Sequence, residues 1–108
     1  MIIRTQNNNT DEKHTVTRII SFEVKPDEIS NHLRFITKDT VDRHIFTLTY
    51  VDENDKIRKM VFSTLSQNVT EIYLDDEKYG YDEMEENAAA FEAIIENKKN
   101  QQAIEALP

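Results

Sequence analysis

Residues 73–95, "YLDDEKYGYDEMEENAAAFEAII", decide the fold because the spacing of apolar residues changes within them. The residues that lead into this segment, 69–74, alternate between two faces, as a β-strand does. Beyond the acidic middle, apolar residues recur at intervals of 4, 3 and 4, which describes one face of an α-helix: Met84, Ala88, Phe91 and Ile95. The segment therefore predicts a strand followed by a C-terminal helix.

The residues before this segment predict strands. Period-two patterns cover residues 13–25, 44–51, 57–65 and 69–74, separated by turn signals such as Asn54-Asp55. Residues 31–37 fit either structure, because Leu33, Phe35 and Thr37 alternate while Ile29, Leu33 and Ile36 fit a helical turn. We interpret them as a strand. The predicted fold is α+β: an antiparallel meander of about five strands, followed by one C-terminal helix packed on the sheet.

Length and composition indicate one ordinary domain. The chain has 108 residues, of which 38% are hydrophobic and 31% charged, values typical of a globular protein. We expect a single domain over 1–108, with 1–12 as a flexible arm or edge strand and 101–108 as a tail. The absence of cysteine excludes disulfides and zinc-thiolate sites. No apolar run is long enough for a membrane helix or a signal peptide, so we expect a cytoplasmic protein.

The negative charge is concentrated in one place. Seven acidic residues and one lysine lie between Asp75 and Glu86, whereas the rest of the chain holds 14 acidic and 12 basic residues. The net charge of −8 gives no electrostatic reason to bind nucleic acid or an anionic membrane directly, since phosphate binding uses clustered Lys and Arg. The acidic stretch has three interpretations, which concern a metal, a helix start and a protein partner.

The metal interpretation compares the stretch with a calcium loop. Counting Asp75 as the first position places Gly80 at the sixth and Glu86 at the twelfth, as an EF-hand requires. The third and fifth positions are then Glu77 and Tyr79, where the loop needs shorter carboxylates or amides. We therefore expect no metal site and no cofactor.

The helix-start interpretation explains part of the acidity. Asp82 followed three residues later by Glu85 is an Asp variant of a capping box. Asp82, Glu83, Glu85 and Glu86 would then occupy the N-cap and first turn, where free N–H groups and the helix dipole favour anions. Gly80 would supply a permissive backbone conformation between strand and helix.

The partner interpretation is compatible with the helix start and covers the acids that capping leaves over. Tyrosines interleave with the carboxylates, and tyrosine is enriched at protein interfaces. If the acids gather at one end of the molecule, they suit a protein with a basic surface. The predicted partner-binding residues are Asp75, Asp76, Glu77, Tyr79, Tyr81, Asp82, Glu83 and Glu86.

No constellation of residues predicts catalysis. One glycine cannot build a phosphate loop, and no serine has the context of a nucleophile elbow. His14, His32 and His44 lack metal-ligand spacing, and an exposed acidic run has nothing to desolvate one carboxylate. We expect no enzyme.

These observations predict a small, acidic, non-enzymatic binding protein that engages a basic surface of a partner. An inhibitor of a nucleic-acid-processing protein, encoded by a phage or mobile element and mimicking nucleic acid, is the most concrete form; an immunity protein is another. The alternative is a structural or assembly component, such as a phage virion or adaptor subunit, which self-associates through a sheet edge or the tail. The pattern indicates no oligomeric state.

Overall fold

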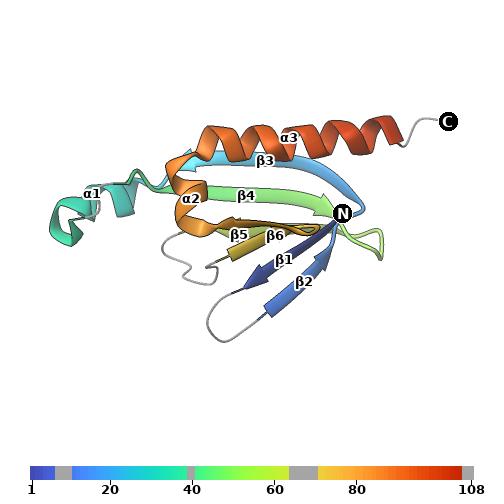
Figure 1. Cartoon of the computed structure of the whole chain (residues 1–108), viewed down its shortest axis with the longest axis horizontal. Coiled ribbons are helices and arrows are strands. Elements are labelled where there is room, and N and C mark those ends of the chain that lie inside the picture. Colours follow the sequence, from blue (N-terminus) through green and yellow to red (C-terminus); the bar gives the residue numbers. More distant parts are fainter. Residues whose placement is uncertain (7–10, 39–40, 64–70, 106–108) are drawn as a thin grey trace.

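A computed structural model of the chain describes residues 1–6, 11–38, 41–63 and 71–105. Within them, seven antiparallel strands form two sheets, and a long C-terminal helix packs against one of them (Figure 1). The predicted α+β class and C-terminal helix are confirmed, although the strands form two sheets rather than one meander of about five. The strands are β1 (Ile2–Gln6), β2 (Asp11–Thr15), β3 (Arg18–Pro26), β4 (His44–Val51), β5 (Ile57–Phe62), β6 (Glu71–Leu74) and β7 (Glu77–Gly80). The helices are α1 (Glu28–Thr37), α2 (Tyr81–Glu86) and α3 (Ala88–Glu105).

The three-stranded sheet has the order β3-β4-β5 and contains the predicted hairpin. β4 and β5 pair in register from Phe46↔Phe62 to Val51↔Ile57. The turn between them uses Asp55 at a φ of 62°, a left-handed conformation that Asp tolerates better than most residues. The predicted strand over 57–65 ends at Phe62, and residues 64–65 lie outside the described part of the chain.

The strand predicted over 13–25 is two strands in different sheets. β2 ends at Thr15 and β3 begins at Arg18, so the chain changes sheet at Val16-Thr17. A register shift between Ile19 and Ser21 marks a bulge in β3. An extra residue reverses the inward and outward alternation, which is why Ile19 and Phe22, three positions apart, are both buried.

The four-stranded sheet has the order β2-β1-β6-β7. β1 pairs with β2 on one side and β6 on the other, so the expected flexible arm or edge strand over 1–12 is wrong for Ile2–Gln6, which form an interior strand. The N-terminal ammonium of Met1 donates to the carbonyl oxygen of Val16 at 2.9 Å. Met1 is therefore bonded to the segment between β2 and β3, where the chain changes sheet.

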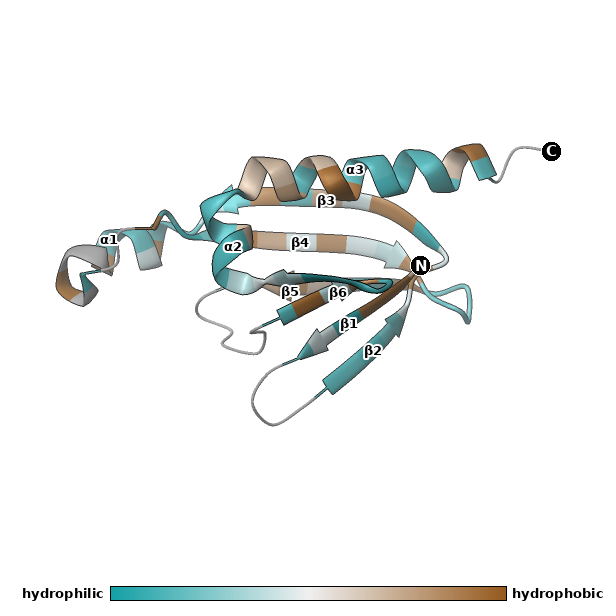
Figure 2. Cartoon of the chain, in the orientation of Figure 1, coloured by the Kyte–Doolittle hydropathy of each residue, from teal (hydrophilic) through white to brown (hydrophobic). Residues whose placement is uncertain are grey.

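The core lies between the two sheets and α3. Phe22, Phe46 and Phe91 form its aromatic centre, with ring centroids 5.7–6.1 Å apart. Figure 2 shows the apolar colour concentrated on the facing strands and the first turns of α3. The second half of α3 is mostly polar, and the helix continues through 101–105, part of the expected tail. No helix in the described residues is long and apolar enough to cross a membrane.

Residues 31–37 belong to helix α1, so the strand expected there is wrong. Asp27 is buried at the helix start, and its carboxylate accepts hydrogen bonds from the Ser30 N–H at 3.2 Å and the Ser30 hydroxyl at 3.0 Å. This is N-cap geometry, which fixes a helix and outweighs a short alternating pattern. The helix projects at one end of the molecule (Figure 1).

Candidate partner-binding site

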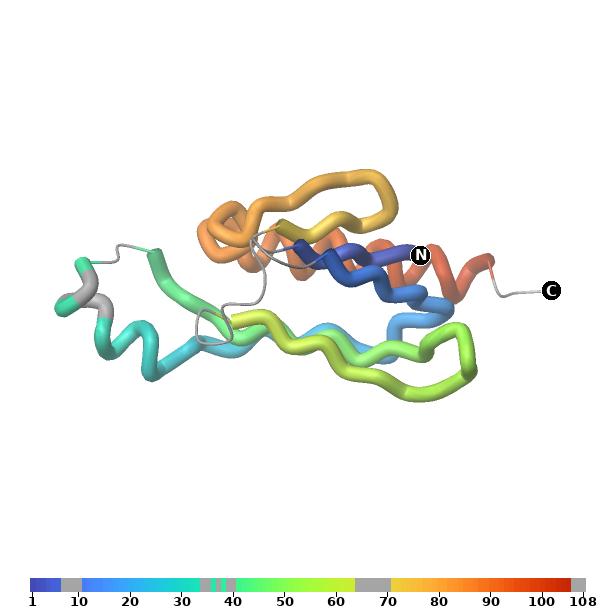
Figure 3. Tube along the Cα trace, turned by 90° about the horizontal axis from the view of Figure 1, so that it is seen from below, coloured from blue at the N-terminus to red at the C-terminus, as the bar shows by residue number. Residues whose placement is uncertain are grey.

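The acidic stretch folds as a hairpin turn, an edge strand and a short helix. Asp75 and Asp76 form the two-residue turn between β6 and β7, and Leu74 pairs with Glu77 across it. Figure 3 shows this hairpin, in yellow to orange, at one margin of the molecule. A calcium loop is incompatible with this fold, because its middle would be the strand β7 and its end the helix α2. Among the described residues, no group of three or more His, Asp and Glu side chains could hold a metal ion.

Asp75 holds the hairpin against the start of β1. Its N–H donates to the Ile2 carbonyl at 2.8 Å, and its Oδ1 accepts from the Ile2 N–H at 2.9 Å. The Lys98 ammonium of α3 lies 3.9 Å from its Oδ2. The residue has a φ of 53°, which suits a hairpin turn. The charge of Asp75, predicted to meet a partner, is therefore engaged within the molecule.

The residues of β7 divide between the two faces of the sheet. Tyr79 points to the core side, where its ring meets Phe91 edge-on at 5.5 Å, and its hydroxyl donates to Glu77 at 2.7 Å. That hydrogen bond, together with burial, raises the pKa of the Tyr79 hydroxyl to about 12. Lys78 points to the opposite face and pairs with Glu71 at 3.1 Å. The lysine of the acidic stretch therefore neutralises a carboxylate outside it.

The tyrosines of the stretch do not form one surface. Tyr73 lies in the same cross-strand row as Lys78, and the guanidinium of Arg4 lies 4.4 Å from the centre of its ring. Tyr79 and Tyr81 are half-buried and pack against the core. We therefore assign both predicted partner-binding tyrosines mainly to packing.

The predicted capping box at Asp82 is wrong. The N-cap of α2 is Gly80, with φ −71° and ψ 145°, and no side chain caps the helix. This extended conformation is open to any residue, so the permissive dihedrals expected of Gly80 are not required. Asp82 and Glu83 lie in the first turn, as the dipole argument predicts. A separate helix, α3, begins after Asn87, so the expected single helix has a break.

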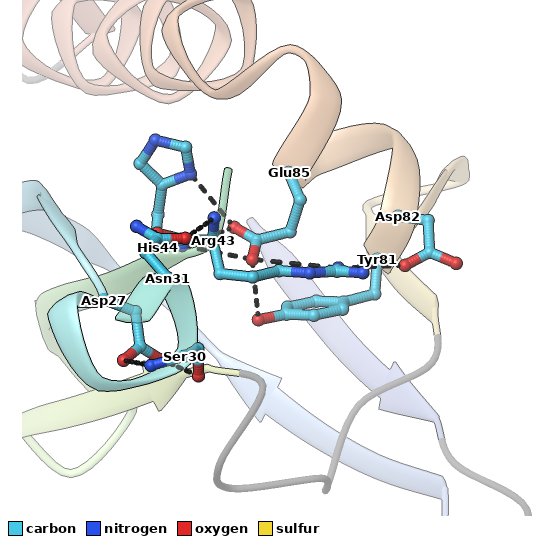
Figure 4. Close-up of polar contacts among 8 residues, drawn as sticks. All are labelled: Asp27, Ser30, Asn31, Arg43, His44, Tyr81, Asp82 and Glu85. Carbon is cyan, nitrogen blue, oxygen red and sulfur yellow. Dashed lines mark hydrogen bonds and ion pairs between the residues drawn. The ribbon is translucent and has the colours of Figure 1, made fainter. Parts of the chain in front are cut away.

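Glu85 is a buried carboxylate that the sequence did not identify. Its side chain is fully buried and accepts from the His44 N–H at 3.0 Å through Oε1 and 3.1 Å through Oε2. His44 Nδ1 lies 3.3 Å from Oε1, and the Tyr81 hydroxyl lies 3.5 Å from Oε2 (Figure 4). Burial raises the pKa of the Glu85 carboxyl, and the hydrogen bonds from His44 oppose that rise. Glu85 fixes α2 to the start of β4.

Arg43 extends the same polar cluster towards the surface. Its Nη1 lies 3.1 Å from Oδ1 of Asp82 and 3.9 Å from Oε2 of Glu85. Its backbone is held by the Asn31 side chain, which accepts from the Arg43 N–H at 2.7 Å and donates to the Arg43 carbonyl at 3.1 Å. Asp82, although exposed, therefore has a cation beside it. Arg43 thus contacts side chains from both helices, Asn31 of α1 and Asp82 of α2 (Figure 4).

The structure thus separates the predicted site residues into two kinds. Asp75, Tyr79, Tyr81 and Asp82 are engaged inside the molecule. Four carboxylates remain exposed and form no ion pair within the described parts of the chain: Asp76, Glu77, Glu83 and Glu86. They flank β7, with the first pair at its hairpin end and the second on α2 at its other end. The partner interpretation expected the acids at one end of the molecule. These four are instead distributed along β7 and α2.

Two hollows adjoin this edge. One, of about 170 Å³, lies between β7, α2 and α3 and is lined by Tyr79, Glu83, Met84, Asn87, Ala90, Phe91 and Ile94. The other, of about 410 Å³, lies beside the Glu85 cluster and is lined by Val41, Asp42, His44, Glu85, Glu86, Ala88 and Ala89. The first is walled mainly by apolar side chains, whereas the second is mainly polar.

No protein-family model, curated protein or solved structure matches the chain.

Proposed function

We propose that this protein is a non-enzymatic binding protein that engages a basic surface of a partner protein through the exposed carboxylates along β7 and α2. We call Asp76, Glu77, Glu83 and Glu86 the acidic edge. The observation that carries the proposal is that these four carboxylates are exposed and none of them forms a close ion pair among the described residues, although Lys78 has a longer-range electrostatic interaction with Glu83. Lys78 pairs with Glu71, and Arg43 pairs with Asp82. A surface with uncompensated charge of one sign steers and selects a partner of the opposite sign.

A basic channel that binds nucleic acid is one surface of this kind. A strand edge with carboxylates at both ends presents negative charges in a row, as a phosphate backbone does. Inhibition of a nucleic-acid-processing protein, or neutralisation of a toxin as an immunity protein, would follow if the acidic edge occupied such a channel. The proposal includes no direct contact with nucleic acid or membrane.

The test is affinity capture followed by mass spectrometry, with the chain as bait. In the test variant, Asp76 is replaced by Asn and Glu77, Glu83 and Glu86 by Gln. The matched control neutralises four exposed acids elsewhere, at Asp11, Glu23, Glu53 and Glu105. We expect a specific partner that the wild type and the control capture and the test variant loses. Equal capture by all three proteins would overturn the proposal.

A second candidate function, self-assembly, is favoured by a different observation. Three large aliphatic residues of α1, Ile29, Leu33 and Ile36, are 62%, 42% and 65% exposed. Their spacing of 4 and 3 puts them on one face of the helix. Ile104, near the described end of α3, is 67% exposed. Exposed apolar side chains at two distant places suit a component that joins copies of itself, as a structural subunit does. Sedimentation velocity over a range of concentrations separates the two functions, because only assembly requires self-association.

A further inference from the structure

We propose that the edge of β7 binds its partner as an added β-strand, in which basic side chains flank one apolar side chain that enters the hollow beside Tyr79. This rests on the proposed function, since it uses the same acidic edge. It adds the form of the ligand, which is an extended segment of the partner rather than a folded basic surface.

The first support is the position of β7 in its sheet. β7 is the last strand in the order β2-β1-β6-β7 and pairs only with β6 among the described strands. In a two-residue hairpin, the pair that flanks the turn is hydrogen-bonded and the next pair is not. The pairs Leu74↔Glu77 and Ile72↔Tyr79 are therefore bonded across the hairpin, and the backbone groups of Lys78 and the N–H of Gly80 point outward. The Gly80 carbonyl belongs to the N-cap of α2. Such an edge is a template for another strand.

The second support is the hollow of about 170 Å³ beside this edge. It lies on the core side of β7, where Tyr79 points, and α3 closes it with Ala90, Phe91 and Ile94. A strand added to β7 would direct every second side chain to this face. One apolar side chain of that strand would then lie over Tyr79 and beside Ile94.

The third support is the distribution of charge around the hollow. Glu77 lies on the same face as Tyr79, two residues away, and its carboxylate accepts a hydrogen bond from the Tyr79 hydroxyl. Glu83 lines the hollow from α2, and its carboxyl group lies over Gly80 at the far end of β7. The ammonium of Lys78 pairs with Glu71 on the opposite face of the sheet and also has an electrostatic interaction with Glu83. Basic side chains two residues before and after the apolar one, each about 7 Å away along the strand, would meet these carboxylates. The ligand is thus basic-x-apolar-x-basic in an extended conformation.

The test uses a library of short random peptides selected against the intact chain. We expect enrichment of peptides with Lys or Arg on both sides of one apolar residue. A selected peptide, made synthetically, should slow amide hydrogen exchange at Lys78 and Gly80, because an added strand bonds those N–H groups. Its affinity should fall about fivefold or more on K78P, which removes one outward N–H. It should fall likewise on A90W, which fills the hollow.

The controls separate this inference from the proposed function. K78A keeps the backbone donor, and A93W adds the same bulk at an exposed position of α3 that does not line the hollow. Both should bind the peptide as the wild type does. If K78P fails to fold, A90W against A93W decides. One outcome would overturn the added strand and leave the proposed function standing. In it, the acidic-edge variant binds the peptide more weakly, but K78P and A90W bind it as the wild type does, and hydrogen exchange at Lys78 and Gly80 is not slowed. Failure to enrich any peptide, or self-association that K78P abolishes, would also overturn the added strand.

Discussion

The carboxylate of Glu85 on α2 accepts both of its shortest hydrogen bonds from the backbone N–H of His44, the first residue of β4, at 3.0 and 3.1 Å. The two residues are 41 positions apart in the sequence. This contact places α2, and with it Glu83 and Glu86 of the acidic edge, against the start of β4. The position of the acidic edge therefore depends on a residue outside it.

Replacing Glu85 should destabilise the fold in a graded way. E85A leaves the His44 N–H buried without an acceptor and opens a space, which should cost about 2–4 kcal/mol of unfolding free energy. E85Q keeps one oxygen acceptor and should cost about 1 kcal/mol. Urea unfolding measures both. Loss of less than about 0.5 kcal/mol in E85A would show that the contact contributes little.

The pH dependence of stability should carry an identifiable contribution from Glu85. Burial raises its folded-state pKa above the ordinary value of 4.5, so the folded state binds its proton more tightly than the unfolded state. This contribution stabilises the fold below pH 4.5 and is lost as the pH rises through the folded-state pKa. The stability of the wild type relative to E85Q should accordingly fall as the pH rises above 4.5.

Glu71 provides the opposite case in the same molecule. The hydrogen bond from Lys78 lowers the pKa of the Glu71 carboxyl below 4.5, so its contribution is present above that pH and lost on acidification. Denaturation curves for wild type, E85Q and E71Q across acidic and neutral pH test both signs. The same slope for the two variants relative to wild type would contradict the assignments.

Asp75 should behave as a structural residue of the hairpin. D75N tolerates a φ of 53° and retains an oxygen for the Ile2 N–H, so we expect a change within about 0.5 kcal/mol. D75A strains the turn and removes the acceptor, which should cost about 1–3 kcal/mol. Thermal unfolding gives the comparison. Equal stability of D75A and wild type would contradict this structural role of Asp75.

The exposed face of α1 predicts the outcome for the second function. Replacing Ile29 and Ile36 with Ser should change stability by no more than about 0.5 kcal/mol, since both side chains are largely exposed. If the chain assembles through this face, sedimentation velocity should show smaller species for the variant. Self-association that is unchanged by the substitution would exclude this face as the contact.

The sequence predicted the elements whose signals are local. The hairpin over β4 and β5 shows clear alternation around an Asn-Asp turn, and the apolar face of α3 shows helical spacing. The sequence contains a signal for helix α1, because Asp27 and Ser30 have the spacing of an N-cap. The alternation of Leu33, Phe35 and Thr37 favoured a strand instead. A short apolar run cannot decide between the two periods by itself.

The features that the sequence did not predict depend on distant contacts. Nothing local distinguishes Glu85 from Glu83 or Glu86, because its burial follows from the approach of β4. The change of sheet at Val16-Thr17 likewise depends on the pairing of β1 with both β2 and β6. The acidic residues were predicted as a group, whereas their division into engaged and exposed carboxylates required the positions of Ile2, Arg43 and Lys98.

The salt dependence of partner binding tests the central claim most directly. Calorimetric titration of the captured partner, at low and physiological salt, would compare the wild type, the acidic-edge variant and the control changed at Asp11, Glu23, Glu53 and Glu105. We predict that affinity falls with salt for wild type and control, and that the acidic-edge variant binds more weakly with a shallower dependence on salt. Equal affinity and equal salt dependence for all three proteins would contradict the claim that the acidic edge binds the partner.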